Sequence, residues 1–219
     1  MNKHQNYEYL LVTGAPGSRW SGVVRDFYYS PDINTSDYKK KNSYTRKGQE
    51  KPMHFGEYFG VNQQYSTNRL EWDKPFKKNS EGLKIIKSHD FAYQLPQLKE
   101  HKQPMLLVYR EPILCFKWWK EAGGWDISYP NYEHYGDDEM MFLNIQNESQ
   151  ELQTFLYYNQ SNITECLSTY DICDFIGIDY PEGIYSITDG QRTSQYEEKQ
   201  IKVYFCLLYT SPSPRDIGE

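Results

Sequence analysis

The sequence predicts an α/β domain in which a central parallel sheet is flanked by helices, giving three layers. The first observation behind this prediction is a set of three short apolar runs, at 9–13, 83–88 and 105–109, each with the length of a buried strand. The second is that segments of helical character follow these runs, and strands that alternate with helices favour parallel pairing. With 219 residues, the chain can bury a sizeable core as one domain.

Helices are predicted between and after the strands. Their ranges are 20–28, 91–102, 112–124, 137–158 and 164–177. Two of the ends carry specific signals, because Pro112 suits the first turn of a helix and Gly177 suits its end. A last short strand is predicted at 184–187, and the polar stretch at 30–51 is interpreted as a loop.

The end of the chain differs in character from what precedes it. The stretch CLLYTSPSPRD, at 206–216, continues no periodicity and resembles translated sequencing-adapter sequence. We therefore interpret 1–205 as a single domain and 206–219 as an artefactual or disordered tail. Whether this tail has replaced a natural C-terminus stays open at the level of the sequence.

Composition restricts the classes of partner. The formal net charge is −6, which argues against a general nucleic-acid surface, so any anion site must be a local basic cluster. No apolar run approaches the roughly 20 residues of a membrane span, and the N-terminus lacks the apolar core of a signal peptide, so we expect a cytoplasmic protein without a membrane partner. The four cysteines form no CxxC pair and no metal-ligand spacing, so no metal is expected.

A loop that follows the first strand is the leading candidate for a binding site. Its residues, which read GAPGSRWS, are Gly14, Ala15, Pro16, Gly17, Ser18, Arg19, Trp20 and Ser21. Unpaired N–H groups at a helix start, together with the helix dipole, favour a phosphate there. A plain turn between strand and helix is an equally good interpretation of the loop alone.

The same loop nearly matches the phosphate-binding pattern GxxxxGK[ST]. Gly14 and Ser21 fit this pattern, but Arg19 stands in place of its second glycine and Trp20 in place of its lysine. Enzymes that act on nucleoside triphosphates need that lysine on the β- and γ-phosphates. The substitution therefore disfavours triphosphate chemistry, whereas backbone N–H groups and Arg19 can still hold a single 5′-phosphate.

Two further segments place polar side chains directly after strands. The segment KIIKSHDFAYQLP, at 84–96, carries Lys87 and His89 after the second strand, and LLVYREP, at 106–112, carries Arg110 after the third. Ligands of parallel sheets bind at the carboxyl ends of the strands. We therefore expect all three segments to face one edge of the sheet.

In this order the three segments resemble the sulfotransferase family. The KSH residues at 87–89 match the family's KTH, the Leu-Pro pair at 95–96 matches the end of the same segment, and Arg110 matches the arginine that follows an apolar strand. The resemblance covers roughly residues 8–125. It implies a P-loop-type fold and the co-substrate 3′-phosphoadenosine 5′-phosphosulfate, without a metal. The family's late glycine-rich RKG element is not visible in this chain.

The resemblance also implies roles for individual residues. His89 would take the proton of the acceptor hydroxyl, since its ordinary pKa lies near neutrality, and Lys87 would stabilise the charge on the leaving group. Arg110 would hold the 3′-phosphate with its planar fork. The family's serine on that phosphate is replaced by Trp118, and Lys117 is the nearest polar substitute.

Plainer interpretations exist for each residue. His89 could cap a helix or lie in the core, Lys87 could be an ordinary solvated lysine, and Arg110 could form a surface ion pair with Glu111, which is worth little. At the level of the whole protein the alternatives are an ATP-dependent small-molecule kinase and a non-catalytic nucleotide- or glycan-binding relic. The expected acceptor is a small-molecule or carbohydrate hydroxyl, and the aromatic residues at 125–135 favour carbohydrate. The oligomeric state stays open.

Overall fold

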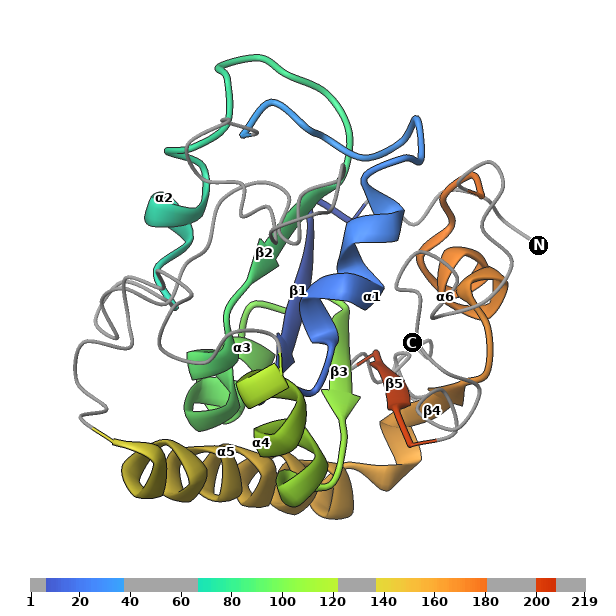
Figure 1. Cartoon of the computed structure of the whole chain (residues 1–219). Coiled ribbons are helices and arrows are strands. Elements are labelled where there is room, and N and C mark those ends of the chain that lie inside the picture. The colour runs from blue at the N-terminus through green and yellow to red at the C-terminus, as the bar shows by residue number, and fades with distance from the viewer. Residues whose placement is uncertain (1–6, 38–66, 122–136, 181–199, 208–219) are drawn as a thin grey trace.

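The computed structural model of the chain describes residues 7–37, 67–121, 137–180 and 200–207 (Figure 1). They form a mixed α/β fold around an open five-stranded sheet with the strand order β2-β1-β3-β5-β4. The three strands expected from the sequence are present, and their bounds are Tyr9–Gly14 for β1, Lys84–Lys87 for β2 and Met105–Tyr109 for β3. The prediction of an α/β fold with parallel strands at its centre is therefore confirmed.

Strand β1 lies between β2 and β3 and is parallel to both. Val12 is paired with Lys87 on one side and with Leu106 on the other, and Gly14 is paired with Val108. The carboxyl ends of the three strands therefore meet at one edge of the sheet. Their arrowheads point toward the side of the molecule where α3 and α4 lie (Figure 1).

The other two strands extend the sheet beyond β3. Strand β5 (Lys202–Cys206) is antiparallel to β3 and to β4 (Ile163–Cys166), which forms the far edge. The sequence assigned the residues of β4 to a helix beginning at 164, and this was wrong, because the helix begins only at Thr169. The last residue of β5, Cys206, is fully buried although the sequence placed it in the tail. The remainder of that tail, 208–219, and the strand expected at 184–187 lie outside the described residues.

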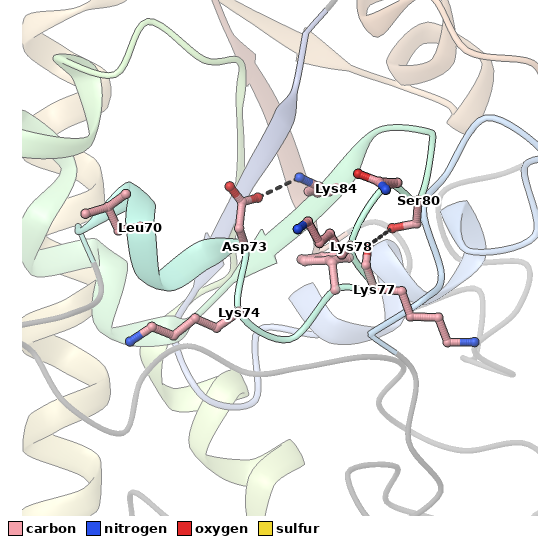
Figure 2. Close-up of a pocket in the computed structure, with 9 residues that line it drawn as sticks. Leu70, Asp73, Lys74, Lys77, Lys78, Ser80 and Lys84 are labelled. Carbon is pink, nitrogen blue, oxygen red and sulfur yellow. Dashed lines mark hydrogen bonds and ion pairs between the residues drawn. The ribbon is translucent and has the colours of Figure 1, made fainter.

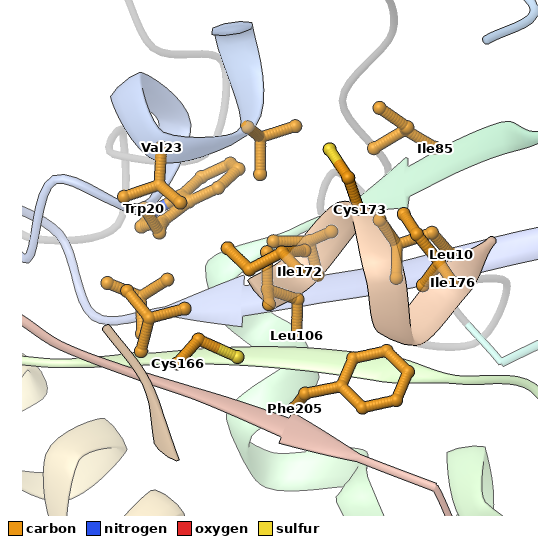
Figure 3. Packing of buried hydrophobic residues seen from close by; sticks show 14 of the residues in the cluster. Leu10, Trp20, Val23, Ile85, Leu106, Cys166, Ile172, Cys173, Ile176 and Phe205 are labelled. Carbon is orange, nitrogen blue, oxygen red and sulfur yellow. The ribbon is translucent and has the colours of Figure 1, made fainter. Parts of the chain in front are cut away.

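Helices α1 (Trp20–Phe27) and α6 (Thr169–Ile176) cover one face of the sheet. Because side chains alternate along a strand, Leu10 points to this face and packs with residues of both helices. Figure 3 shows Trp20 and Val23 of α1, Ile172 of α6 and Phe205 of β5 in this cluster. Burial of each large apolar side chain stabilises the fold by about 1.5–3 kcal/mol.

The opposite face is covered by shorter elements and one long helix. These are α2 (Arg69–Trp72), the 3₁₀ helix η2 (His89–Gln94), α3 (Leu95–Lys99) and α5 (Asp138–Tyr158). They pack Trp72, Phe91, Leu98 and Leu152 against the strands. Helix α4 (Pro112–Glu121) lies on α5, and the turn η5 (Gln160–Asn162) joins α5 to β4.

Local signals set several of the helix ends. Pro112 begins α4 as expected, and the Asp137 side chain caps α5 by accepting from the amide of Met140. Helix α6 begins with a capping box in which Ser168 and Asp171 bond each other's amides. It ends at Gly177, whose φ of 73° confirms the predicted end of this helix. Within the described ranges, no helix has both the length and the apolar character that crossing a bilayer requires.

Candidate functional site

The three segments singled out in the sequence lie at one edge of the sheet, as predicted. The loop 14–19 follows β1, the pair Lys87 and His89 lies at the end of β2, and Arg110 follows β3. The amide of Ser88 donates to the carbonyl of Val12 at 3.1 Å, which fastens the second segment to the strand that carries the loop. The parallel register therefore brings together residues that are nearly 100 positions apart in the chain.

The loop after β1 is packed tightly beneath helix α4. Gly17 has a φ of +80°, and a Cβ atom added there would lie 1.9 Å from the carbonyl oxygen of Cys115. Only glycine meets both conditions, because it lacks a Cβ and adopts positive φ without strain. The amide of Ser18 closes the turn by donating to the carbonyl of Ala15 at 2.9 Å.

Arg19 lies against helix α4. Its side chain is buried, and the central carbon of its guanidinium lies 3.9 Å from the centroid of the Trp118 ring. Stacking of this kind contributes about 0.5–2 kcal/mol. Its φ of 74° is rare for a residue other than glycine. Trp118 thus contacts the candidate loop, whereas its neighbour Lys117 is exposed.

Arg110 is buried and joins β3 to the loop. Its Nη1 donates to the carbonyl of Gly17 at 3.4 Å, and its Nη2 donates to Oε1 of Gln200 at 3.5 Å. The interpretation as a surface ion pair with Glu111 was wrong, because Arg110 is only 4% exposed and the carboxylate of Glu111 accepts from the hydroxyl of Tyr109. The guanidinium therefore belongs to the interior of the site.

Two buried polar atoms beside Gly17 have no hydrogen-bond partner among the described residues. They are the hydroxyl of Ser18, in a fully buried side chain, and Nε of Arg110. Such atoms are uncommon, and each costs about 1–3 kcal/mol when it stays unsatisfied. Both can donate a hydrogen bond, so an oxyanion that reached them would satisfy them. This part of the site is chemically suited to an anion.

Lys87 is directed toward helix α1. Its side chain is 1% exposed, and Nζ donates to the hydroxyl of Tyr28 at 2.7 Å. The interpretation as an ordinary solvated lysine was therefore wrong. A buried ammonium is costly unless it is hydrogen-bonded, so the phenol is part of what keeps this charge in place. Tyr28 was missed in the sequence, because no local pattern relates two residues that are 59 positions apart.

His89 is the first residue of η2, but its side chain lies outside the described part of the structure. The cap of η2 is supplied by Ser88, whose side chain accepts from the amide of Asp90 at 3.1 Å. The N-cap of η2 is therefore Ser88.

A buried polar chain on α5 was also missed. The hydroxyl of Tyr93 donates to Oδ1 of Asn144 at 3.0 Å, and Nδ2 of Asn144 donates to Oε1 of Glu148 at 3.1 Å. Glu148 is fully buried.

Burial raises the pKa of the Cys115 thiol to about 12, with Arg110 lowering that pKa and Glu148 raising it. Arg110 and Glu148 therefore both act electrostatically on the thiol of this α4 residue, which packs on the loop. The helical spacing of Glu148 relative to Ile145 and Leu152 would have placed it on the buried side.

Among the described side chains, no group of three or more His, Cys, Asp or Glu residues could hold a metal ion. The aromatic residues at 125–135, expected to contact the acceptor, lie outside the described ranges.

Comparison of the chain with protein-family models, curated proteins and solved structures found no match. The class that the fold defines is that of mixed α/β proteins with an open sheet whose centre is mostly parallel.

Proposed function

We propose that the chain is a sulfotransferase with a three-layer P-loop-type fold. It would transfer the sulfuryl group of 3′-phosphoadenosine 5′-phosphosulfate to a hydroxyl acceptor, with carbohydrate as the favoured class. The observation that carries the proposal is the position of Arg110, whose guanidinium contacts Gly17 in the candidate phosphate loop. A donor with separate 5′ and 3′ phosphates needs cations and N–H donors from two segments, and β1 and β3 provide two adjacent ones.

The binding part of the proposal rests on groups that can donate to oxyanions. In the first turn of α1 the amides of Gly22 and Val23 already donate to the carbonyl of Arg19, which leaves the amide of Ser21 as a donor toward an oxyanion. The hydroxyl of Ser18 and Nε of Arg110 add buried donors that have no partner among the described residues. We assign the 5′-phosphate to the loop 14–21 and the 3′-phosphate to Arg110, with Lys117 as an exposed cation on the adjoining helix.

The chemical part assigns two roles at the end of β2. In the reaction, a bond forms between the acceptor oxygen and sulfur, and the bond between sulfur and the leaving phosphate oxygen breaks. His89 would accept the proton that the acceptor hydroxyl loses. Lys87 would stabilise the negative charge on the leaving oxygen, and to do so its ammonium would exchange the hydroxyl of Tyr28 for that oxygen.

One observation argues against an ATP-dependent kinase. The position where such enzymes carry the loop lysine is occupied by Trp20, which is buried in the core with Val23 and Leu10. No cation can be supplied from this position to a triphosphate. A non-catalytic binding relic would bind the same ligands but would show no turnover. An activity measurement therefore distinguishes it from the proposed enzyme.

The proposal is tested by thermal shift and by turnover. We expect 3′-phosphoadenosine 5′-phosphate to raise the melting temperature, because a ligand at 100 times its Kd stabilises a protein by about 2.7 kcal/mol. ATP with magnesium should have little effect. Transfer of labelled sulfate to a panel of sugars should be lost in His89→Ala, while the melting shift remains. Stabilisation by ATP with magnesium alone would contradict the proposal, and a shift without any turnover would favour the non-catalytic relic.

A further inference from the structure

A second candidate site lies at the opposite end of β2, away from the edge described above. It is a pocket of about 440 Å³ between α2 and the turn that leads into β2. Figure 2 shows four lysines around it, Lys74, Lys77, Lys78 and Lys84. Lys84 is the first residue of β2, whereas Lys87 at the last position belongs to the other edge. The volume is within the range that accommodates small organic ligands.

One wall of the pocket is built around Lys84. Its ammonium bonds Oδ1 of Asp73 at 2.6 Å, and the same carboxylate oxygen accepts from the hydroxyl of Tyr9 at 2.9 Å. Lys84 also lies over the rings of Tyr9 and Phe76, at 5.4 and 5.7 Å from their centroids. The hydrogen bond to Asp73 and the cation–π contacts with the two rings thus restrain this cation. Its side chain therefore has little rotamer freedom left to lose when an anion binds.

The opposite wall is the turn that carries Lys77 and Lys78, and side-chain hydrogen bonds fix its conformation. Nδ2 of Asn34 donates to Oγ of Ser80 at 2.8 Å, and Oγ of Ser80 donates to the carbonyl of Lys77 at 2.6 Å. The amide of Lys77 donates to Oγ of Ser36 at 3.0 Å. The backbone positions of the two lysines are therefore set before any ligand arrives.

The charges of the pocket are not balanced internally. Lys74 pairs with Glu71, and Lys84 pairs with Asp73 and lies 4.0 Å from Oε1 of Glu8, but Lys77 and Lys78 have no carboxylate partner among the described residues. This cationic surplus occurs in a chain whose formal net charge is −6. Local concentration of one sign of charge in a concave site raises the occupancy of ligands of the opposite sign.

We infer that this pocket binds a small polyanion that carries at least two phosphate or sulfate ester groups. Lys77 and Lys78 contact the anionic groups, and the restrained ammonium of Lys84 anchors them at the sheet. The site is independent of the proposed sulfuryl transfer, because its lysines precede or begin β2 while the other site follows the strand.

Titration calorimetry of the whole chain tests the inference with two probes, tripolyphosphate and a disulfated disaccharide. The variant Lys77→Gln/Lys78→Gln should lower the affinity by roughly tenfold or more, equivalent to about 1.4 kcal/mol. The control, Lys120→Gln/Lys202→Gln, removes the same charge from exposed positions elsewhere and should lower it less than about twofold. The two probes report separately on the binding of phosphate groups and of sulfate esters.

A second variant guards against an effect of folding. Asn79→Asp places a carboxylate in the pocket and leaves every lysine intact, and aspartate tolerates the φ of 63° at this position. This variant should lower the affinity for both probes, while the melting temperature of the free protein stays unchanged. Equal losses in the pocket and control variants, or no binding of either probe to the wild type, would overturn the inference. Binding of 3′-phosphoadenosine 5′-phosphate should be unaffected by the two pocket variants.

Discussion

The guanidinium of Arg19 stacks on the ring of Trp118, 3.9 Å from its centroid, and this contact joins the candidate phosphate loop to helix α4. Since the contact depends on an aromatic face, Trp118→Leu should lower the free energy of unfolding by about 1 kcal/mol. Trp118→Phe keeps an aromatic face and should lower the free energy of unfolding by less. Urea denaturation measures both values, and equal losses in the two variants would show that the stacking contributes nothing.

Gly17 should be among the least replaceable residues of the loop. Gly17→Ala forces a Cβ atom against the carbonyl of Cys115 and places alanine at positive φ, so we expect a loss of roughly 2–5 kcal/mol. Gly22→Ala, inside α1, is the matched control and should be neutral or stabilising. Thermal denaturation distinguishes them. A Gly17→Ala variant as stable as the control would mean that α4 does not pack on the loop.

The hydrogen bond between Lys87 and Tyr28 allows the structural role of Lys87 to be tested separately from its proposed chemical role. Tyr28→Phe removes one acceptor of a buried ammonium and should destabilise the fold by about 1–3 kcal/mol. Lys87→Met removes the charge itself, so the double variant should be less unstable than the sum of the single changes. Turnover should be lost in Lys87→Met and largely retained in Tyr28→Phe. Retention of turnover in Lys87→Met would remove Lys87 from the proposed mechanism.

The carboxylate of Asp73 predicts a dependence of stability on pH. Burial acts to raise its pKa, but the bonds from Lys84 and Tyr9 outweigh this and hold it below the ordinary value of 3.8. A group with a lowered folded-state pKa contributes stability above its unfolded-state pKa and loses it as the pH falls through the folded-state value. Asp73→Asn should therefore be less stable than the wild type at pH 7.

The same difference should shrink at acidic pH, as the pH falls through the lowered pKa of the wild-type carboxylate and Asp73 becomes protonated. Urea denaturation of both proteins at several pH values measures it. A constant difference across the range would show that the destabilisation is not electrostatic.

The sequence was sufficient for the centre of the sheet, because local patterns encode it. The apolar runs of β1, β2 and β3 and the polar residues directly after them predicted which side chains share an edge. Contacts between distant residues were out of reach. Stacking of Arg19 on Trp118 and bonding of Lys87 to Tyr28 depend on how helices pack, and no spacing in the chain signals either.

Strands β4 and β5 were missed for a related reason. Strand β4 is short and half exposed, with the residues Ile163, Thr164, Glu165 and Cys166, and its residues also fit the start of the helix that follows. Strand β5 begins with an exposed residue and ends with two buried ones. It becomes a strand only through its neighbours, and β3 precedes it by almost 100 positions.

The position of β5 has a consequence for how the chain acquires its fold. This strand lies between β3 and β4 and bonds both of them, although it is the last element described. During synthesis, β3 and β4 therefore have unpaired edges until Cys206 has emerged from the ribosome. Such edges pair readily with other chains. Folding that depends on a late, distant strand is slow. A chain that stops before residue 202 would keep the β1, β2 and β3 core but leave two aggregation-prone edges exposed.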